Sequence, residues 1–219
     1  MKLEMSECEI PLKKAVEYKV VSNKSDYLNF LEADRIALGR NKMTLKFRLK
    51  DLIYPDYIWK FQRLLRKMEY YKNTKGKNPL ERAYYYLLKI KFLKLSLKLG
   101  FTIPENVFGP GLAIVHYGTI VVNVNSKIGA NCRLHASTNI GESGGVFGAP
   151  LIGDNVYIGP GAKIYGKISI ASNTAIAANA CVGKTFTEEN ILLGGIPARP
   201  LKEIDIRQII KHLSLISTV

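Results

Sequence analysis

The 219-residue chain is poor in cysteine, with only Cys8, Cys132 and Cys181. Three cysteines in this length do not build a disulfide framework, and their spacing offers no metal site, so no bound metal is expected. No segment approaches the roughly 18 apolar residues that cross a bilayer, so a transmembrane helix is not predicted. The chain does not open with basic residues followed by a long apolar run, so a secretory signal is not predicted either. These absences predict a reduced, cytoplasmic protein.

Acidic residues are also few, with 18 against 32 lysines and arginines, which gives a formal net charge of +14. Residues 41–100 hold sixteen basic residues and four acidic ones, whereas residues 111–200 hold six and four. A basic region attracts phosphates or anionic lipid headgroups. Three roles of this basic region therefore stay open. It contacts the inner face of a membrane, binds an anionic substrate, or is simply a solvated helix face. Nucleic-acid binding is not expected, because no recognition motif accompanies the charge.

Histidine is scarce too, which limits the candidates for a general base. The chain has three, His116, His135 and His212. Imidazole has a pKa near neutrality and is the side chain used most often for proton transfer at neutral pH. His212 follows Lys211 in the C-terminal tail and is expected to be solvated. A cysteine nucleophile is disfavoured, because no histidine stands at a fixed spacing to activate Cys181.

The main positive feature is a repeat of six residues. Eleven consecutive positions at this spacing are aliphatic: Val122, Ile128, Leu134, Ile140, Val146, Ile152, Ile158, Ile164, Ile170, Ile176 and Val182. Neither a helix nor an alternating strand has a period of six, whereas a β-helix offers one large apolar side chain per short strand to a narrow core. Three hexapeptides per turn predict about four coils. The glycine-rich stretch 141–149 is expected to bulge out as a loop without changing the phase.

The residues before the repeat are helical in pattern. Apolar side chains between Ile58 and Met68 recur every three or four residues, and a further helix is predicted from Pro79 to a stop at Gly100. The predicted fold class is therefore α+β, with an N-terminal helical subdomain (1–104), a parallel β-helix of hexapeptide repeats (105–200) and a short C-terminal helix in the tail (201–219).

Four segments carry a resemblance to a known family. They are FGPGLAIVHYGTIVVN (108–123), KIGANCRLHASTNIGESGG (127–145), APLIGDNVYIGPGAKIYGKISIASNTAIAANACV (149–182) and GGIPARPL (194–201). The chain resembles the serine acetyltransferase group of the left-handed β-helix acyltransferases, and within it the acetyltransferases of bacterial polysaccharide gene clusters. The resemblance implies a left-handed coil, acetyl-CoA as cosubstrate, no metal, and a homotrimer with active sites between subunits.

The resemblance also implies roles for individual residues. The catalytic base of the family maps onto His116, which lies six residues before Val122 on the extension of the repeat. His135 lies nineteen residues later, so an 18-residue coil places it one rung above and one residue over, where it would bind acceptor or orient the base. The coenzyme side maps onto Gly161, Ala162, Ala180, Lys184 and Arg199, of which the last two are candidate phosphate partners. By position alone, structural or solvated roles stay open for these polar residues.

Departures from true serine acetyltransferases fall on the acceptor side. Val115 stands where the family has an aspartate before the catalytic histidine, and Ala149-Pro150-Leu151-Ile152 replaces the family's HPKI. The aspartate that orients the base, expected near Thr102, is absent, and Glu105 is the nearest carboxylate that would replace it beside the substrate. We therefore expect acetyl transfer to a sugar hydroxyl, free or lipid-linked, in surface polysaccharide biosynthesis. The alternatives are a serine O-acetyltransferase and a catalytically inactive trimeric scaffold.

Overall fold

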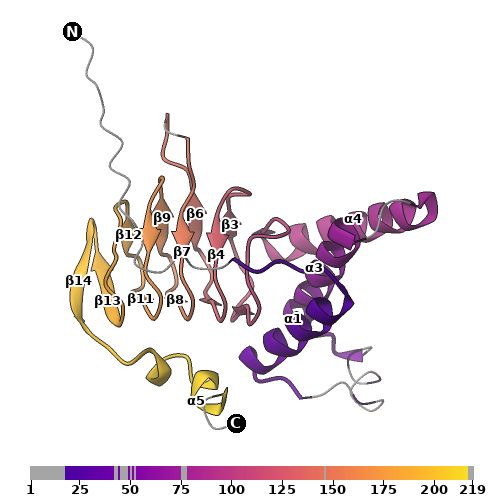
Figure 1. Cartoon of the computed structure of the whole chain (residues 1–219), viewed down its shortest axis with the longest axis horizontal. Helices are drawn as coiled ribbons and strands as arrows, with labels where there is room; N and C mark the ends of the chain where they lie inside the picture. Colours follow the sequence, from indigo (N-terminus) through magenta and orange to yellow (C-terminus); the bar gives the residue numbers. More distant parts are fainter. Residues whose placement is uncertain are drawn as a thin grey trace.

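A bundle of helices stands at one end of a long coil of short strands (Figure 1). The computed structural model describes residues 18–41, 44, 49, 51, 53–74, 78–145 and 147–216. The expected order of a helical subdomain, a left-handed parallel β-helix and a short C-terminal helix is confirmed. Among the described residues, no helix combines the length and the apolar character that crossing a bilayer requires.

Three helices form the N-terminal part: α1 (Lys24–Ala37), α3 (Tyr57–Thr74) and α4 (Pro79–Leu99). The side chain of Asn78 accepts a hydrogen bond from the amide of Leu80 at the start of α4, and Pro79 follows as the first helical residue. Gly100 ends α4 with φ 75°, a left-handed conformation that glycine adopts without steric cost. The predicted limits of α4 are thus confirmed to the residue.

The β-helix has three sheets, one for each side of a triangular prism. The sheet orders are β1-β3-β6-β9-β12, β4-β7-β10 and β2-β5-β8-β11-β13-β14, with all pairs parallel except the last. The strands are β1 (Phe101–Thr102), β2 (Ala113–Ile114), β3 (Ile120–Val122), β4 (Lys127–Ile128), β5 (Arg133–Leu134), β6 (Asn139–Gly141), β7 (Leu151–Ile152), β8 (Tyr157–Ile158), β9 (Lys163–Tyr165), β10 (Ser169–Ile170), β11 (Ala175–Ile176), β12 (Cys181–Val182), β13 (Ile191–Gly195) and β14 (Ala198–Glu203).

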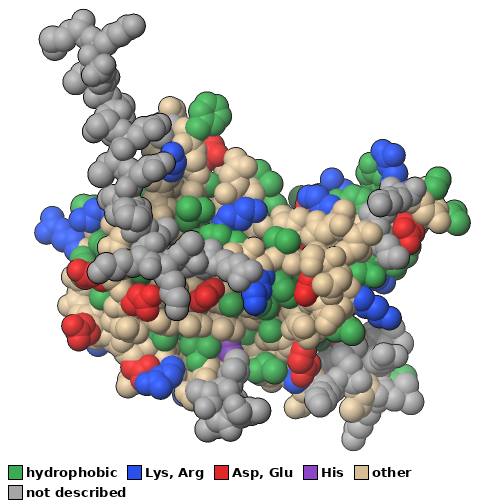
Figure 2. Space-filling view, in the orientation of Figure 1, with side chains coloured by type: hydrophobic (Ala, Val, Ile, Leu, Met, Phe, Trp, Pro, Cys, Tyr) green, Lys and Arg blue, Asp and Glu red, His purple; other side chains and the backbone are tan. Residues whose placement is uncertain are grey.

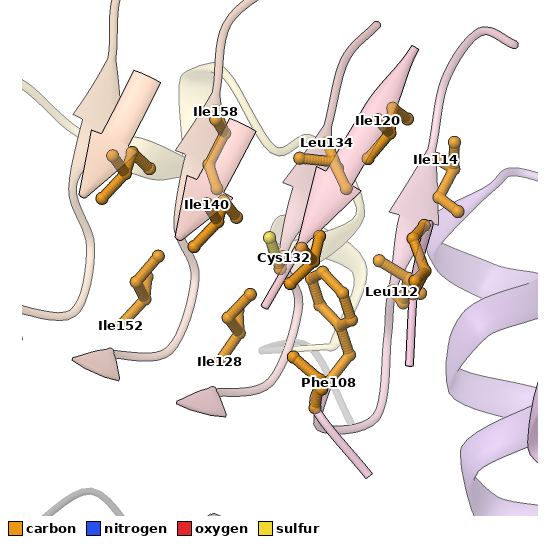
Figure 3. Close-up of a cluster of buried hydrophobic side chains, with 14 of the residues drawn as sticks. Phe108, Leu112, Ile114, Ile120, Ile128, Cys132, Leu134, Ile140, Ile152 and Ile158 are labelled. Atoms are coloured by element: carbon orange, nitrogen blue, oxygen red, sulfur yellow. The ribbon is translucent and has the colours of Figure 1, made fainter. Parts of the chain in front are cut away.

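The apolar positions of the repeat stack inside the prism. Ten of the eleven are described and each is at most 2% exposed, whereas Val146 lies outside the described residues. Figure 3 shows several of them pointing into the core from successive coils. Each coil offers only one large side chain per strand, so stacking coils is the way this chain buries a continuous apolar core. The sextet pattern therefore encodes the core of the β-helix directly.

Strand register shows how the glycine-rich segment is accommodated. Val121 pairs with Asn139, 18 residues later, as three hexapeptides per turn require. Asn139 in turn pairs with Lys163, 24 residues later, so one whole hexapeptide leaves the coil between them. The surplus forms the loop that projects beyond β6 in Figure 1. The expectation of a bulge that preserves the phase is confirmed, because a surplus of six returns every later side chain to the same side of the prism.

The number of coils exceeds the prediction. The sheet that starts at β1 has five strands, against about four expected turns. The additional rung precedes the repeat, since β1 pairs with β3 through Phe101 and Ile120. This strand lies N-terminal to the expected domain boundary at residue 104, and β14 crosses the expected boundary at residue 200. The domain limits remain a prediction.

The C-terminal segment lies along one side of the β-helix. The expected short helix is α5 (His212–Ile216), and a 3-10 turn, η1 (Ile206–Gln208), precedes it. Ile206 and Ile210 pack against Ala175 of β11. His212 is buried, 8% exposed, with Nε2 3.4 Å from Oδ1 of Asn131, so the expectation that it is solvated is wrong. Because Ile206 and Ile210 pack against the sheet, His212 also lies against the β-helix.

A buried charge cluster fastens the helices to the first coil. The guanidinium of Arg66 pairs with Asp34 at 2.8 Å and with Glu69 at 3.0 Å, and all three side chains are at most 2% exposed. Asp34 Oδ1 also accepts hydrogen bonds from the amides of Gly111 and Leu112 at 2.9 and 2.8 Å. Because these amides belong to the β-helix, the cluster fixes the position of α1 and α3 against it. Buried charges need such complete pairing to be tolerated.

Candidate active site on the first coils

Two of the three histidines meet on neighbouring coils. His116 follows β2 and His135 follows β5, and β2 pairs with β5 through Ile114 and Leu134. The ring centroids are 6.0 Å apart with an interplanar angle of 57°. The parallel register thus brings together two imidazoles that lie nineteen residues apart in the sequence, as expected.

The geometry of His116 nevertheless differs from the expectation. Ile114 pairs with Leu134, 20 residues later, so the first rung does not follow the 18-residue spacing. Eight residues separate Ile114 from Val122, whereas six separate their partners Leu134 and Ile140. His116 lies in this longer corner and is exposed, rather than continuing the buried ladder. The two extra residues therefore keep the imidazole at the surface, where a substrate can reach it.

His135 has a more enclosed environment. Its side chain is half-buried, and the ring of Tyr157 on β8 lies 5.1 Å away. Burial, together with the positive charge of Arg133 and the neighbouring His116, lowers the pKa of His135 below its usual value. Among the described residues, Nε2 of His135 is buried with no hydrogen-bond partner. A neutral imidazole with an unpaired nitrogen is suited to bind a polar group of a ligand.

Tyr157 was not singled out by its sequence position. It precedes a ladder residue, as Arg133 does one coil earlier, and the two residues pair across β5 and β8. The 24-residue offset created by the projecting loop brings Tyr157 against His135. The spacing of the repeat alone gives no signal for this contact, because the aliphatic phase continues unbroken through the stretch 141–149.

Glu105 lies at the junction with the helices. Its carboxylate accepts a hydrogen bond from the Tyr85 hydroxyl at 2.9 Å and pairs with Lys72 at 3.4 Å. Burial raises the pKa of Glu105, but the hydrogen bond from Tyr85 and the charge of Lys72 outweigh it and lower the pKa. None of the contacts in the described part of the chain joins Glu105 to His116. The carboxylate is engaged by the helical subdomain instead of orienting the base.

Two of the residues expected to line a coenzyme groove are in the core. Ala162 and Ala180 have no exposed surface, and their carbonyls accept the amides of Asn139 and Lys163 from adjacent coils. The small side chains fill the narrow interior of the prism and offer no surface to a ligand, so their place beside a coenzyme stays a prediction. Gly161 is partly exposed with φ 76°, and a Cβ there would lie 2.0 Å from the Asn179 side chain. Glycine is thus required at this corner by packing alone.

The two cationic candidates are exposed at the far end of the β-helix. Lys184 follows β12, and Arg199 lies on β14, the edge strand opposite β2 in the same sheet. His116 and Arg199 thus mark the two ends of one sheet. The described residues contain no cluster of three or more histidine, cysteine or carboxylate side chains that would hold a metal ion.

Cysteine chemistry is not supported by the structure. Cys132 is 1% exposed, and burial raises the pKa of its thiol to about 12. A thiol in this environment stays protonated near neutral pH and has no access to a substrate. Cys132 is therefore not available as a nucleophile at this surface.

Comparison with known proteins identifies the kind of coil. Residues 149–184 match the bacterial transferase hexapeptide family (six repeats). The chain thus carries hexapeptide repeats and is similar to the serine acetyltransferases. It is 34% identical over 106 residues to the serine acetyltransferase of Staphylococcus aureus strain Mu50, which covers 48% of this chain and 49% of that protein. The chain thus spans about half the length of the curated relatives that it matches.

Solved structures extend the likeness to the helices. The serine acetyltransferase of Neisseria gonorrhoeae superposes with a TM-score of 0.61 at 26% identity, over 82% of this chain and 68% of that one. The serine acetyltransferase of Brucella abortus strain S19 in complex with coenzyme A superposes with a TM-score of 0.60 at 24% identity, over 83% and 70%. At 24% identity, the likeness to the Brucella abortus structure shows the fold alone. These comparisons favour serine acetyltransferase, the alternative function, over the sugar acetylation that the sequence departures suggested.

Proposed function

We propose that this hexapeptide-repeat protein is an acetyl-CoA-dependent O-acetyltransferase whose acceptor is the hydroxyl of L-serine. The observation that carries the proposal is the pair of imidazoles of His116 and His135, 6.0 Å apart on adjacent coils, with His116 exposed. The names of the similar proteins supply the reaction class and the acceptor. An exposed imidazole is available as a general base, which acetyl transfer to an alcohol requires.

In the proposed mechanism, His116 removes the proton of the acceptor hydroxyl. Acetyl-CoA supplies an acetyl thioester when bound. His135, held neutral by burial, offers its unpaired Nε2 to the acceptor and keeps a second positive charge away from His116. The His116 imidazolium then returns the proton to the departing thiolate, so that the transfer is direct and leaves the imidazole neutral. Backbone N–H groups near the site would stabilise the oxyanion.

For the coenzyme, we propose that Lys184 and Arg199 bind phosphate groups. Both side chains are exposed, and both lie beyond the last coils, away from the histidines. Gly161, which is partly exposed, is the remaining candidate for the groove between them. Neutralising Lys184 or Arg199 should raise KM for acetyl-CoA much more than KM for the acceptor. Equal effects on both would contradict a role in coenzyme binding.

We also propose a homotrimer with its active sites between subunits. His116 is exposed at its corner of the coil, and Tyr117 beside it is 72% exposed. A neighbouring protomer packed on this side would supply a second wall for the site and cover the aromatic ring. Light scattering in solution tests the assembly, and a monomer with full activity would contradict it.

A sugar hydroxyl is the second candidate acceptor. Val115 presents an apolar side chain beside His116, and Ala149 is buried where the resembled family has a histidine. These residues offer no charge to a serine carboxylate or ammonium group. The acceptor is therefore the part of the proposal that an assay must decide.

The deciding assay follows thiol release from acetyl-CoA with L-serine or a panel of sugars as acceptor. We expect O-acetylserine to form, and His116→Ala to lower kcat about 100- to 10,000-fold. His212→Gln serves as a control, because His212 contacts Asn131 and has no contact with His116 or His135 in the described part of the chain. Product from sugars only would move the assignment to the second candidate. A protein that does not bind acetyl-CoA in calorimetry would be a scaffold without turnover.

A further inference from the structure

Helix α4 carries two apolar faces, and only one of them is covered. Leu88, Phe92, Leu95 and Leu99 are buried against α3 and the first coil. A second row of large apolar side chains is at least half exposed: Leu80, Tyr86, Leu87, Ile90, Leu93 and Leu97. At about 3.6 residues per turn, these six positions form one continuous stripe along the helix. Exposed apolar surface of this extent marks an interaction site.

Basic side chains flank this exposed stripe on both sides. The helical positions of Lys91 and Lys98 place them along one border, and those of Arg82 and Lys89 place them along the other. Lys94 lies between Leu87 and Ile90 near the first border. Glu81 is the one acidic residue of α4. Figure 2 shows blue and green side chains intermingled over the end of the molecule that α4 forms. A stripe of apolar residues bordered by lysines is the pattern of a helix that lies in a membrane interface.

A cationic groove adjoins the lysine border. It has a volume of about 760 Å³ and lies between α3 and α4, with Tyr27 of α1 at one side. Its basic lining residues are Lys60, Arg63, Lys67, Lys91, Lys94 and Lys98. Lys67 donates a hydrogen bond to the Tyr84 hydroxyl at 2.6 Å. In the described part of the chain, no salt bridge neutralises Lys60, Lys91 or Lys94. The groove is thus suited to the phosphate of a lipid headgroup.

We propose that α4 docks the protein on the surface of an anionic lipid bilayer. The exposed stripe of leucine, isoleucine and tyrosine side chains lies among the acyl chains at the interface, and the flanking lysines and the groove contact anionic headgroups. The lysine and arginine stems also lie along the apolar surface while their charges reach the headgroups. The inference is independent of the acetyl-transfer proposal, since His116 and His135 follow strands of the β-helix and do not belong to α4.

Charge argues against a second copy of the chain as the partner of this stripe. Two α4 helices packed through their exposed faces would bring five basic residues of each copy together, with only Glu81 of each to offset them. Like charges at such close range are destabilising. An anionic bilayer satisfies the same cations and covers the same apolar side chains.

The test is flotation of the full chain with vesicles of phosphatidylcholine alone or mixed in equal parts with phosphatidylglycerol. We expect binding to the mixed vesicles and not to the neutral ones. Binding to the mixed vesicles should weaken strongly when the salt concentration is raised, because salt screens the charges. Lys91→Gln with Lys94→Gln should lower the partition coefficient about 30-fold, at about 1 kcal/mol per basic residue near the surface. Ile90→Glu with Leu97→Glu should abolish binding.

Matched controls change the same residue types elsewhere on the surface. Val124→Glu alters another side chain that is 60% exposed, and Lys202→Gln with Lys211→Gln removes two exposed charges. These variants should float like the wild type, and circular dichroism should show that every variant is folded. The proposal is overturned if the wild type binds neither vesicle or if the controls lose binding equally. It is also overturned if the wild type does not bind lipid and Ile90→Glu with Leu97→Glu lowers the mass of the protein assembly in solution. The stripe would then join two copies of the chain.

Discussion

Replacing Asp34 by alanine tests how the helical subdomain is fastened to the β-helix. The carboxylate accepts two hydrogen bonds from Arg66, at 2.8 and 3.1 Å, and two more from the amides of Gly111 and Leu112. Alanine leaves a fully buried guanidinium with Glu69 as its remaining carboxylate. It also leaves both β-helix amides without their acceptor.

The expected cost is large because burial is complete. Removing one partner of a buried ion pair costs about 3–5 kcal/mol. Each amide left without a partner adds about 1–3 kcal/mol unless water enters the space. Asp34→Asn should cost less than Asp34→Ala, since its amide oxygen still serves Gly111 and Leu112. Because single domains are stable by about 5–15 kcal/mol, the alanine variant should lose a large part of the total.

Urea unfolding, followed by circular dichroism, measures this cost. The urea concentration at the midpoint should fall while the dependence of the unfolding free energy on urea stays the same. Glu32→Ala is the control, because Glu32 also pairs with an arginine but its side chain is 50% exposed. Surface pairs contribute about 0–1 kcal/mol, so this variant should unfold close to the wild type. Equal losses for Asp34→Ala and Glu32→Ala would show that the buried cluster does not fasten the helices.

Three further measurements follow from the burial of particular side chains. Burial lowers the pKa of both His135 and His212, so the unfolded chain binds protons more readily. The free energy of unfolding should therefore be full above about pH 6.5 and fall as pH drops through that value, and His212→Gln should flatten the fall. Cys132, with its pKa raised to about 12, should resist alkylation in the native protein while Cys181 is modified, as mass spectrometry of digests would show. Ile158→Ala should cost about 2–5 kcal/mol in urea unfolding, and a loss below about 1 kcal/mol would contradict its place in the core.

Local rules were sufficient for the elements that depend on local sequence. The limits of α4 follow from Pro79 and Gly100, and the coil follows from one aliphatic residue in every six. The projecting loop was also predictable, because only a surplus of whole hexapeptides keeps later residues in phase. The meeting of His116 and His135 followed from the near-match between their separation and one turn of the coil.

The sequence was less informative where a residue's surroundings come from distant segments. Glu105 pairs with Lys72 and Tyr85 of the helices, which no spacing within the repeat reveals. Ala162 and Ala180 belong to motifs associated with the coenzyme, yet their side chains occupy the interior of the prism. Motif position tells which coil a residue occupies, whereas its phase in the repeat decides whether it points inward.

The sequence determined the order of helices and coil, the core of the prism and the two histidines proposed for the site, because each depends on periodicity or on the scarcity of a residue type. Only the tertiary structure decided that the corner of His116 is two residues longer than its neighbour, that Tyr157 lies against His135, and that Asp34, Arg66 and Glu69 are buried together. These outcomes depend on how strands register and segments pack across long separations. Side-chain patterns fix which face is apolar, but the contacts between faces are set by the whole folded chain.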